Sequence, residues 1–315
     1  MSLPLIECVP NFSEGRREDV LAALAASIRD VPGVHLLDVS PDPDHNRSVY
    51  TFVGGPEAVV EAAYRSAAIA LQRIDLRTHR GVHPRIGAVD VIPFVPLHDA
   101  GMDACAALAR DLAGRLAADF GLPAYLYGAA SAGAARILAT IRRGGFESLR
   151  TEIAHPARHP DYGPARVHPT GGAVAVGARE ILIAFNVDLA STDLAAARAI
   201  AAAVRESSGG LPAVQAMGVP MASRGLVQVS MNLLDYRRTS LRSALERVGA
   251  EAARRGIGIA AGELVGCAPR DALPPDPVAA LRLRGLRPEQ ILDLEQLVRA
   301  FSTVEEPPAG AAGHP

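Results

Sequence analysis

The sequence predicts an α+β fold made of two ferredoxin-like βαββαβ units, and three observations support this prediction. The order strand, helix, strand, strand, helix, strand can be followed through residues 5–95 and again through residues 181–265. Apolar residues recur at helical spacing in the helical stretches and alternate in several strands. The stretch between the two sets is rich in Pro and Gly, which is typical of a connection. Each unit should form a sheet covered by helices, which gives two α/β subdomains.

The first unit begins with a short apolar strand. Its first helix carries Val20, Leu21, Leu24 and Ile28 on one face. Its second helix begins at Pro56, because proline is well tolerated in a first helical turn. The predicted elements are a strand at 5–10, a helix at 16–28, strands at 35–39 and 47–53, a helix at 56–71 and a strand at 86–95.

The second unit repeats this order after residue 180. We expect Ser191 to cap its first helix and Thr239 to cap its second, since hydroxyl side chains accept hydrogen bonds from free backbone N–H groups. Gly256 is expected to end the second helix. The predicted elements are a strand at 181–187, a helix at 191–206, strands at 213–219 and 226–234, a helix at 239–254 and a strand at 257–265.

Further elements lie between and after the two units. They are a helix at 102–119, a strand at 125–127, a helix near 134–142 and a terminal helix at 288–300. The Pro- and Gly-rich stretch 160–177 is predicted to join the units. We therefore expect an N-terminal subdomain at residues 1–180, a C-terminal subdomain at residues 181–304 and a disordered tail at residues 305–315.

Composition excludes several classes of function. The formal net charge of the 315-residue chain is −2, which leaves no basic footprint for nucleic acid or an anionic membrane. No stretch is suited to a membrane span, and the N-terminus lacks the pattern of a signal peptide. Cys8, Cys105 and Cys267 are far apart, which favours a reduced, cytoplasmic protein. The chain has no lysine, so Schiff-base chemistry and a phosphate-loop lysine are excluded.

The most unusual segment is Thr78–Asp90, THRGVHPRIGAVD. His79 and His83 are four residues apart, a spacing that suits a metal site on a helix. Gly81 lies between them, and Pro84 pushes His83 toward extended geometry, so a loop is expected instead. No neighbouring acidic cluster completes a metal site. Two interpretations stay open, an acid/base histidine that titrates near neutral pH or two histidines that hydrogen-bond in a turn.

Other polar clusters accompany this segment. Arg85 can hold a carboxylate in a bidentate contact. Asp38–Arg47, DVSPDPDHNR, suits an ordinary turn, but a turn does not require His, Asn and Arg together. Val9–Ser13 is consistent with a helix cap. Gly163–Gly172, GPARVHPTGG, is either a linker or a ligand-binding wall between the two halves.

Together these segments resemble the formiminotransferase family, and the resemblance follows the chain in order. The segment centred on HPR is its most specific part. The matching stretches are ECVPNFSEG at 7–15, LLDVSPDPDHNRSVYTFVG at 36–54, HRGVHPRIGAVDVIPFVP at 79–96, YLYG at 125–128, PDYGP at 160–164, ILIAFNVDL at 181–189 and VSMNLLDY at 229–236.

The resemblance implies an activity. Tetrahydrofolate, the co-substrate, and N-formimino-L-glutamate would give 5-formiminotetrahydrofolate and L-glutamate, a step of histidine degradation that uses no metal. The catalytic histidine of the family's GxHPR segment corresponds to His83. The family's folate-contacting loop corresponds to Gly163, Pro164, Ala165, Arg166, Val167, His168, Pro169, Thr170, Gly171 and Gly172. A homodimer is also implied.

A substrate-positioning set follows from the polar clusters. It consists of Asn11, Ser40, Asn46, Arg47, His79 and Arg85. Arg47 and Arg85 are the candidates for the substrate carboxylates. Where animal members of the family carry an aspartate this chain has Ser40, so Asp42 or Asp44 would have to supply an acid if one is needed. The chain is too short for a cyclodeaminase domain, and we expect a separate protein to process the product.

Three other functions stay open. One is a metal-dependent hydrolase that cleaves formiminoglutamate. The second is a non-catalytic folate-binding module. The third is a formyl transfer of the same family, linked to 5-formyltetrahydrofolate or N-formylglutamate. The sequence does not separate formyl from formimino donors.

Overall fold

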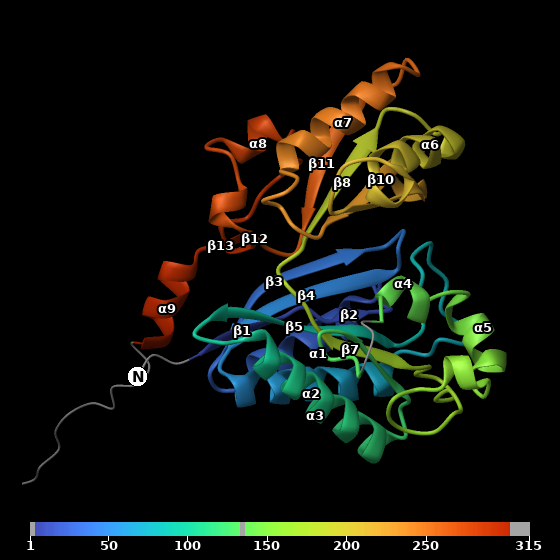
Figure 1. Ribbon diagram of the computed structural model, residues 1–315, viewed down its shortest axis with the longest axis vertical. Helices are drawn as coiled ribbons and strands as arrows, with labels where there is room; N and C mark the ends of the chain where they lie inside the picture. Colours follow the sequence, from blue (N-terminus) through green and yellow to red (C-terminus); the bar gives the residue numbers. More distant parts are fainter. Residues whose placement is uncertain (1–3, 133–135, 303–315) are drawn as a thin grey trace, which may run out of the picture.

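The computed structural model describes residues 4–132 and 136–302, which form two layered units that face one another (Figure 1). In each unit helices cover one face of a sheet, and the other face is turned toward the opposite unit. The mixed α/β architecture with two subdomains agrees with the prediction. The predicted tail at 305–315 lies outside the described residues. None of the helices described is long and apolar enough to cross a membrane.

The sheet of the first unit has seven strands within the described residues. The short strands β1 and β2 both lie between β4 and β5, with β3 at one edge of the sheet. Beyond β5 the sheet continues through β7 to β6, and these last pairings are parallel. The bounds are β1 (Leu5–Cys8), β2 (Asn11–Phe12), β3 (Val34–Asp42), β4 (Arg47–Gly54), β5 (Val89–His98), β6 (Ala124–Gly128) and β7 (Val174–Ala178).

Three long helices cover the outer face of this sheet: α1 (Glu18–Arg29), α2 (Pro56–Arg73) and α3 (Met102–Phe120). The predicted face of α1 is buried at Val20, Leu24 and Ile28. Phe12 and Tyr50 meet edge to face beneath the helices, with ring centroids 5.3 Å apart. Burial of this apolar surface is the main favourable contribution to the stability of the unit.

The second unit has four antiparallel strands in the order β11, β8, β10, β9. Across this sheet the last strand of the unit lies beside the first, followed by the third and then the second. The first unit has the same arrangement: β5 lies beside β1 and β2, followed by β4 and then β3. The bounds are β8 (Ile183–Leu189), β9 (Val214–Met221), β10 (Leu226–Leu233), β11 (Ile259–Val265), α6 (Leu194–Val204) and α7 (Leu241–Ala253).

Both predicted helix caps in this unit are wrong by one or two residues. The carboxylate of Asp193, not Ser191, accepts hydrogen bonds from the first free N–H groups of α6, at 2.8 and 3.1 Å. Ser240, not Thr239, caps α7. The Thr239 hydroxyl instead donates to the carbonyl of Pro212 across 2.6 Å. Several residues near each helix start had a suitable side chain, and only the point at which the chain turns selects among them.

The predicted connection at 160–177 is also wrong in part, because it contains most of β7. Val174 and Val176 are buried, and the strand lies between β5 and β6. Gly177 is needed there, since a Cβ on it would lie 2.5 Å from the Tyr127 ring. The predicted helix at 134–142 is reduced to α4 (Leu138–Ile141), and residues 133–135 lie outside the described residues.

Several elements were not predicted. They are β2 (Asn11–Phe12), α5 (Gly145–Glu152), α8 (Pro277–Ala280), β12 (Ala268–Pro269) and β13 (Ile291–Leu292), with short 3-10 turns at 156–158, 206–208, 222–224, 270–272 and 288–290. The predicted helix at 288–300 is therefore a turn, then β13, then α9 (Leu294–Ser302). Helix α9 returns to the first unit, where the Phe301 and His35 rings lie 4.4 Å apart.

Candidate active site

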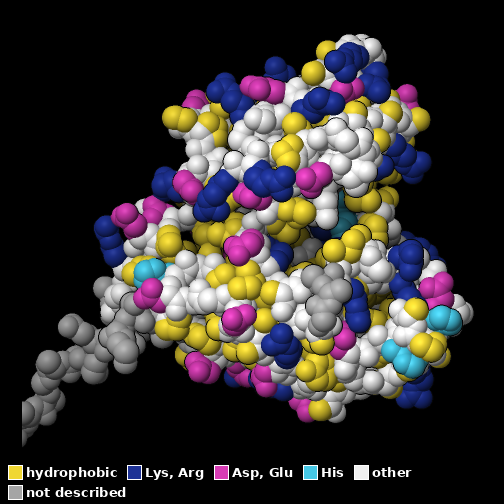
Figure 2. Space-filling model, in the orientation of Figure 1, with side chains coloured by type: hydrophobic (Ala, Val, Ile, Leu, Met, Phe, Trp, Pro, Cys, Tyr) yellow, Lys and Arg dark blue, Asp and Glu magenta, His cyan; other side chains and the backbone are white. Residues whose placement is uncertain are grey.

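A cavity of about 760 Å³ lies between the uncovered faces of the two sheets. Figure 2 shows the molecule hollowed between the upper and lower units. Side chains that face the cavity alternate along strands of both sheets, as the pleat of a strand requires. The first unit contributes Glu7, Asn11, Arg47, Thr51 and Tyr127, among others, and the second contributes Asn186, Gln215, Ser230 and Asn232.

His83 lies on the wall of this cavity, on the loop between α2 and β5. Neither His83 nor His79 is helical, so the predicted loop is confirmed. Arg47, the first residue of β4, donates a hydrogen bond from Nη1 to Nε2 of His83 across 2.6 Å. The imidazole of His45 stacks against that of His83, with ring centroids 5.7 Å apart. The base nitrogen of His83 therefore faces a guanidinium.

Burial and the positive charges around His83 hold its pKa well below the usual value. Burial is the largest cause, followed by the charges of Arg47 and Arg142 and by His45. The imidazole is therefore neutral at pH 7 and has a lone pair on Nε2, which accepts the Arg47 hydrogen bond. Arg142 is itself neutralised, since it donates to the Asp90 carboxylate across 2.5 Å.

Arg47 has no such counter-ion. Burial and the charge of Arg142 lower the pKa of Arg47 to about 10. Among the residues that the structure describes, its guanidinium forms no ion pair with a carboxylate. A charged group removed from water without a partner is costly, so this guanidinium favours an anionic ligand.

Asn46 and His79 hold the loops that carry Arg47 and His83. The Asn46 amide accepts from the backbone N–H of Gly15 at 3.0 Å and donates to the carbonyl of Arg80 at 2.9 Å. His79 donates from Nε2 to the Asn46 carbonyl at 2.8 Å and accepts from Arg85 at Nδ1. Both nitrogens of this buried ring are occupied, so His79 is not free to exchange a proton with a ligand.

Gly81 permits the close approach of these loops. A Cβ at this position would lie 2.2 Å from the carbonyl oxygen of His45. Asn46 adopts a φ of 47°, in the left-handed region that Asn tolerates better than most residues. The two residues therefore keep His45 and His83 in contact.

Other members of the predicted positioning set have partners other than His83. Arg85 lines the cavity, but it is already paired with Glu147 at 2.9 Å. Asn11 also lines the cavity, and its amide donates to the carbonyl of Val9. The Ser40 hydroxyl donates to Asp38 and accepts from the backbone N–H of Gly266, so Ser40 connects the two units rather than reaching His83.

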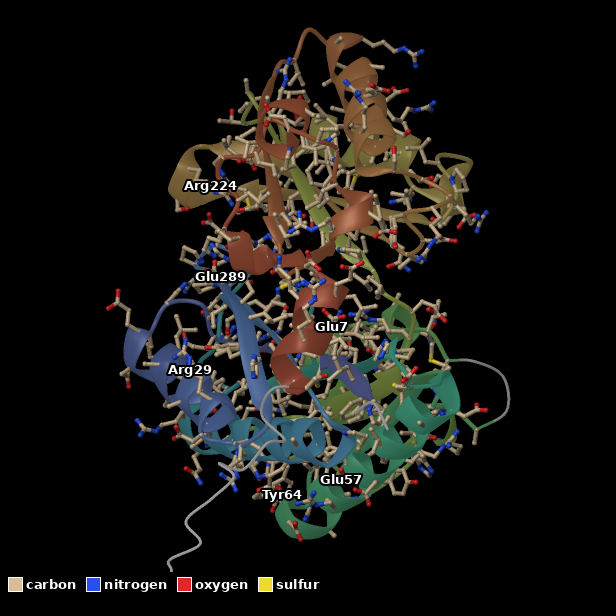
Figure 3. All side chains as sticks on the ribbon, turned by 90° about the vertical axis from the view of Figure 1, so that its left-hand side faces the viewer. Glu7, Arg29, Glu57, Tyr64, Arg224 and Glu289 are labelled. Carbon is tan, nitrogen blue, oxygen red and sulfur yellow. The ribbon has the colours of Figure 1, made fainter. Side chains whose placement is uncertain are left out.

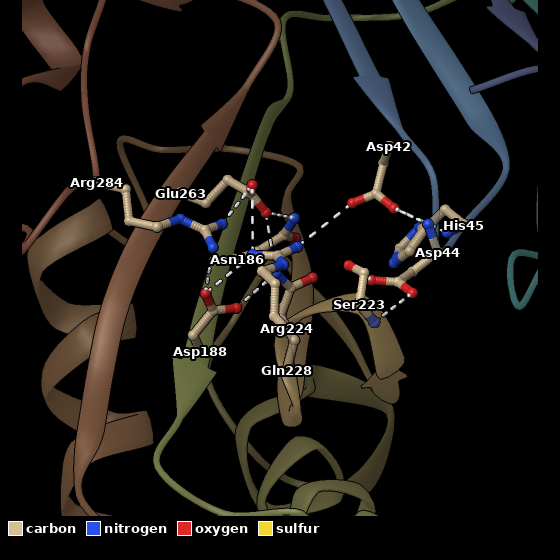
Figure 4. Close-up of polar contacts among 10 residues, drawn as sticks. All are labelled: Asp42, Asp44, His45, Asn186, Asp188, Ser223, Arg224, Gln228, Glu263 and Arg284. Atoms are coloured by element: carbon tan, nitrogen blue, oxygen red, sulfur yellow. Dashed lines mark hydrogen bonds and ion pairs between the residues drawn. The ribbon is translucent and has the colours of Figure 1, made fainter. Parts of the chain in front are cut away.

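Asp42 and Asp44, the two acids proposed to replace the one absent at Ser40, also face the second unit (Figure 4). The Asp44 carboxylate accepts from the hydroxyl of Ser223 at 2.6 Å and from its backbone N–H at 3.0 Å. Asp42 pairs with Arg224 at 3.4 Å. In this arrangement neither carboxylate hydrogen-bonds to His83.

Arg224 joins Asp42, the last residue of β3, to the second sheet (Figure 4). Its guanidinium lies 3.0 Å from the buried carboxylate of Asp188, which also receives Arg284 at 2.8 Å and the Gln228 amide at 2.8 Å. Because a buried carboxylate needs its full set of donors, this network fixes the position of Arg224. The end of β3 and the turn at 43–46 are therefore held against one defined site on the second unit.

The predicted folate loop at 163–172 does not line the cavity. It packs beside the start of β5, where the Gly171 carbonyl accepts from the backbone N–H of Ala88 at 2.9 Å. The His168 ring accepts from the Gly171 N–H, and the loop closes on itself between His168 and Gly172. It therefore supports the segment that follows His83, and its contact with folate stays a prediction.

Sequence reasoning missed four residues of the site: Glu7, His45 as the ring stacked on His83, Arg142 and Arg179. Glu7 gave a signal, because an acid within the apolar strand LIEC is unusual in a buried element. Arg142 and Arg179 gave none, since each is one of many arginines in the chain. Across the described ranges 4–132 and 136–302, no group of three or more His, Cys, Asp or Glu side chains could hold a metal ion.

Comparisons with known proteins identify the family. Residues 5–179 match the family described as "Formiminotransferase domain, N-terminal subdomain", and residues 184–276 match "Formiminotransferase domain". The chain belongs to the formiminotransferase family. The two matched ranges include the strands that line both sides of the cavity.

Relatives within the formiminotransferase family are similar over most of this chain. It is 42% identical over 294 residues to the glutamate formimidoyltransferase of Thermoplasma acidophilum, a match that covers 92% of this chain and 97% of the relative. It is 40% identical over 270 residues to that of Streptococcus pyogenes, covering 85% and 90%. The rat formimidoyltransferase-cyclodeaminase is 44% identical over 276 residues, covering 85% of this chain and 51% of the relative.

Proposed function

We propose that this protein is a glutamate formimidoyltransferase, which transfers the formimino group of N-formimino-L-glutamate to N5 of tetrahydrofolate. The similarity to two glutamate formimidoyltransferases over at least 85% of this chain supports the activity. The observation that carries the proposal is the His83–Arg47 pair on the cavity wall, a neutral imidazole against a guanidinium without a counter-ion. One group can move protons, and the other can hold an anionic substrate.

His83 would act as both base and acid. N5 of the folate attacks the amidine carbon, forming the new C–N bond, and its proton passes to Nε2 of His83. The tetrahedral intermediate then breaks its bond to the glutamate nitrogen, which takes the proton from His83. The imidazole is neutral at pH 7 and accepts the proton of N5, and the depressed pKa of His83 favours return of that proton to the glutamate nitrogen.

Arg47 would bind a carboxylate of formiminoglutamate. In the free site its guanidinium occupies Nε2 of His83, the nitrogen that must accept the proton. A substrate carboxylate competes for the same donors and forms the stronger, charge-assisted contact. Substrate binding would therefore release Nε2. Arg85 is a weaker candidate, because Glu147 already neutralises it.

The two units would hold the two substrates between them. Holding both reactants in one cavity replaces a bimolecular encounter with a step inside one complex, which is a large part of the rate in such transfers. His79 and Asn46 would position His83, while Asn11 lies on the same cavity wall. Ser40 would act through the contact between the units.

Several finer features belong to the same proposal. Both units would be copies of a ferredoxin-like βαββαβ unit, with the boundary between residues 180 and 181, supported by the strand order that they share. The loop at 163–172 would contact the part of the folate that extends beyond the cavity. The protein would be a cytoplasmic homodimer that needs no metal, acts in histidine degradation and passes its product to a separate cyclodeaminase.

The test is a transfer assay with purified protein and tetrahydrofolate. Formiminoglutamate and N-formylglutamate are compared as donors, each with and without a chelator. The proposal predicts turnover with formiminoglutamate that requires folate and withstands the chelator. Preference for N-formylglutamate would instead indicate a formyltransferase. Folate-independent release of formamide that the chelator abolishes would indicate a metal hydrolase.

A further inference from the structure

Glu7 is a buried acid in the cavity that the mechanism above does not use. It lies on β1 between the two units (Figure 3). Only 5% of its surface is exposed. Its side chain lines the cavity. Among the described residues none donates a hydrogen bond to its carboxylate. Buried carboxylates normally accept several hydrogen bonds, so a carboxylate that lines a cavity and has no donor from the described protein can accept hydrogen bonds from a ligand in that cavity.

The position of Glu7 separates it from the reacting atoms. Glu7 pairs with Val53 of β4, while Arg47 and its contact to His83 are at the other end of that strand. From residue 53 to residue 47 the backbone covers about 20 Å, at about 3.3 Å per residue. The side chains of Glu7 and Arg47 both line the cavity, at opposite ends of this length. The formimino group must lie at His83, so Glu7 contacts another part of a substrate.

Arg179 supplies the second half of a recognition site. It also lines the cavity, and its charge is the favourable one acting on Glu7. One of its N–H groups donates to the carbonyl of Glu180, which leaves other donors of the guanidinium available. The backbone N–H of Arg179 donates to the carbonyl of Phe94, which pairs with Cys8, the residue after Glu7. The cavity wall therefore has a carboxylate and a guanidinium on adjacent segments, and these offer acceptors and donors to one ligand.

The edge of a 2-amino-4-oxopyrimidine ring complements this arrangement. N3–H and the 2-amino group form a planar pair of donors, and O4 beside them is an acceptor. The formamidinium of formiminoglutamate has donors but no such acceptor, so Arg179 favours the folate. We propose that Glu7 and Arg179 form the subsite for the pyrimidine edge of the pterin, with Glu7 accepting from N3–H and the 2-amino group and Arg179 donating to O4.

This inference rests on the proposed function, since it takes folate as the ligand. It orients the pterin with its pyrimidine edge toward Glu7 and its N5 side toward His83. Burial raises the pKa of the Glu7 carboxyl to about 7, and Arg179 opposes that rise. Hydrogen bonds from the pterin would favour the ionised carboxylate.

The test is calorimetric titration of wild type and Glu7→Gln without formiminoglutamate and without oxygen. The ligands are tetrahydrofolate and its 2-desamino-2-methyl analogue, which lacks the 2-amino donor. Wild type should prefer tetrahydrofolate by about 10- to 100-fold, the range for a hydrogen bond to a charged group. In Glu7→Gln the preference should fall below about threefold. An equal preference in both proteins would overturn the inference.

Two controls separate this result from misfolding and from failure of the proposed function. Glu57→Gln changes an exposed acid on α2, on the helical outer side (Figure 3), and should retain the preference of wild type. Glu7→Gln should keep its KM for formiminoglutamate and raise its KM for folate. A raised KM for formiminoglutamate alone would place Glu7 at the amidine and overturn the inference. If wild type binds no folate, the proposed function fails, and this inference fails with it.

Discussion

Arg47 donates a hydrogen bond to Nε2 of His83 across 2.6 Å, at the wall of the cavity between the two sheets. The contact joins a guanidinium without a counter-ion to an imidazole whose pKa burial and Arg47 depress. An anion that binds Arg47 would therefore change two properties of His83: the hydrogen bonding of its Nε2 atom and the pKa of its ring.

Replacing His83 by Ala should reduce turnover by roughly 10²- to 10⁴-fold, the usual contribution of a positioned acid/base group. Affinity for tetrahydrofolate should be largely unchanged, because the change removes proton transfer and leaves the cavity in place. His159→Ala, an exposed histidine far along the chain, is the matched control. Steady-state turnover close to that of wild type in His83→Ala would show that another group moves the proton.

Replacing Arg47 by Ala should raise the KM for formiminoglutamate by about 10- to 100-fold, the range for a lost charge-assisted contact. The KM for tetrahydrofolate should change much less. Arg85→Ala should have the smaller effect on the formiminoglutamate KM, because Arg85 is already paired with Glu147. The idea would be refuted by an Arg85 variant that loses formiminoglutamate binding while Arg47→Ala keeps it.

The pH profile should report the charge of Arg47. His83 must be neutral to accept a proton, so the rate falls as pH drops through its pKa. Because that pKa lies well below 6.5 in the free protein, kcat/KM should be level around neutral pH and fall only in the acid range. Removal of the Arg47 charge should move this acid limb to higher pH. NMR titration of the His83 ring compares the pKa in the two proteins without turnover. If the acid limb of kcat/KM lay at the same pH in Arg47→Ala and in wild type, the charge of Arg47 would not set the pKa of His83.

Asn46 should contribute through two separable effects. Asn46→Gly removes the two side-chain hydrogen bonds, to Gly15 and Arg80, but tolerates the positive φ. Asn46→Ala loses the same bonds and adds strain. We expect a cost of about 1–3 kcal/mol in unfolding free energy for Asn46→Gly and about 1 kcal/mol more for Asn46→Ala, measured by urea denaturation. Equal stability of the two variants would contradict the strain at this position.

Glu7 should make stability depend on pH. Its pKa is raised from 4.5 to about 7 in the folded protein, so the folded state binds the proton more tightly than the unfolded chain. Its contribution is fully present below pH 4.5 and is lost as pH rises toward 7. The unfolding free energy of Glu7→Gln, relative to that of wild type, should therefore rise by up to about 3 kcal/mol between pH 4 and pH 8. Urea denaturation at both pH values measures the gain, and Glu57→Gln should show none.

The sequence indicated the fold well where local patterns coincide with tertiary packing. The helix face of Val20, Leu24 and Ile28 is buried, and Pro56 is the first residue of α2. Strand β7 escaped prediction because Gly177 lies within its short apolar run, where the small size of glycine serves packing against Tyr127 rather than a turn. The helix caps were missed for a related reason, since several neighbouring residues could each serve as a cap.

The sequence by itself determined the order of the main elements, the loop geometry of His83 through Pro84 and the resemblance that the family matches bear out. Tertiary structure alone decided which groups meet at the site. Arg47 reaches His83 because a strand start and a distant loop are packed side by side, and Asp42 and Asp44 face Arg224 and Ser223 instead. Such contacts depend on how the sheets stack, and the spacing of residues along one chain does not encode that directly.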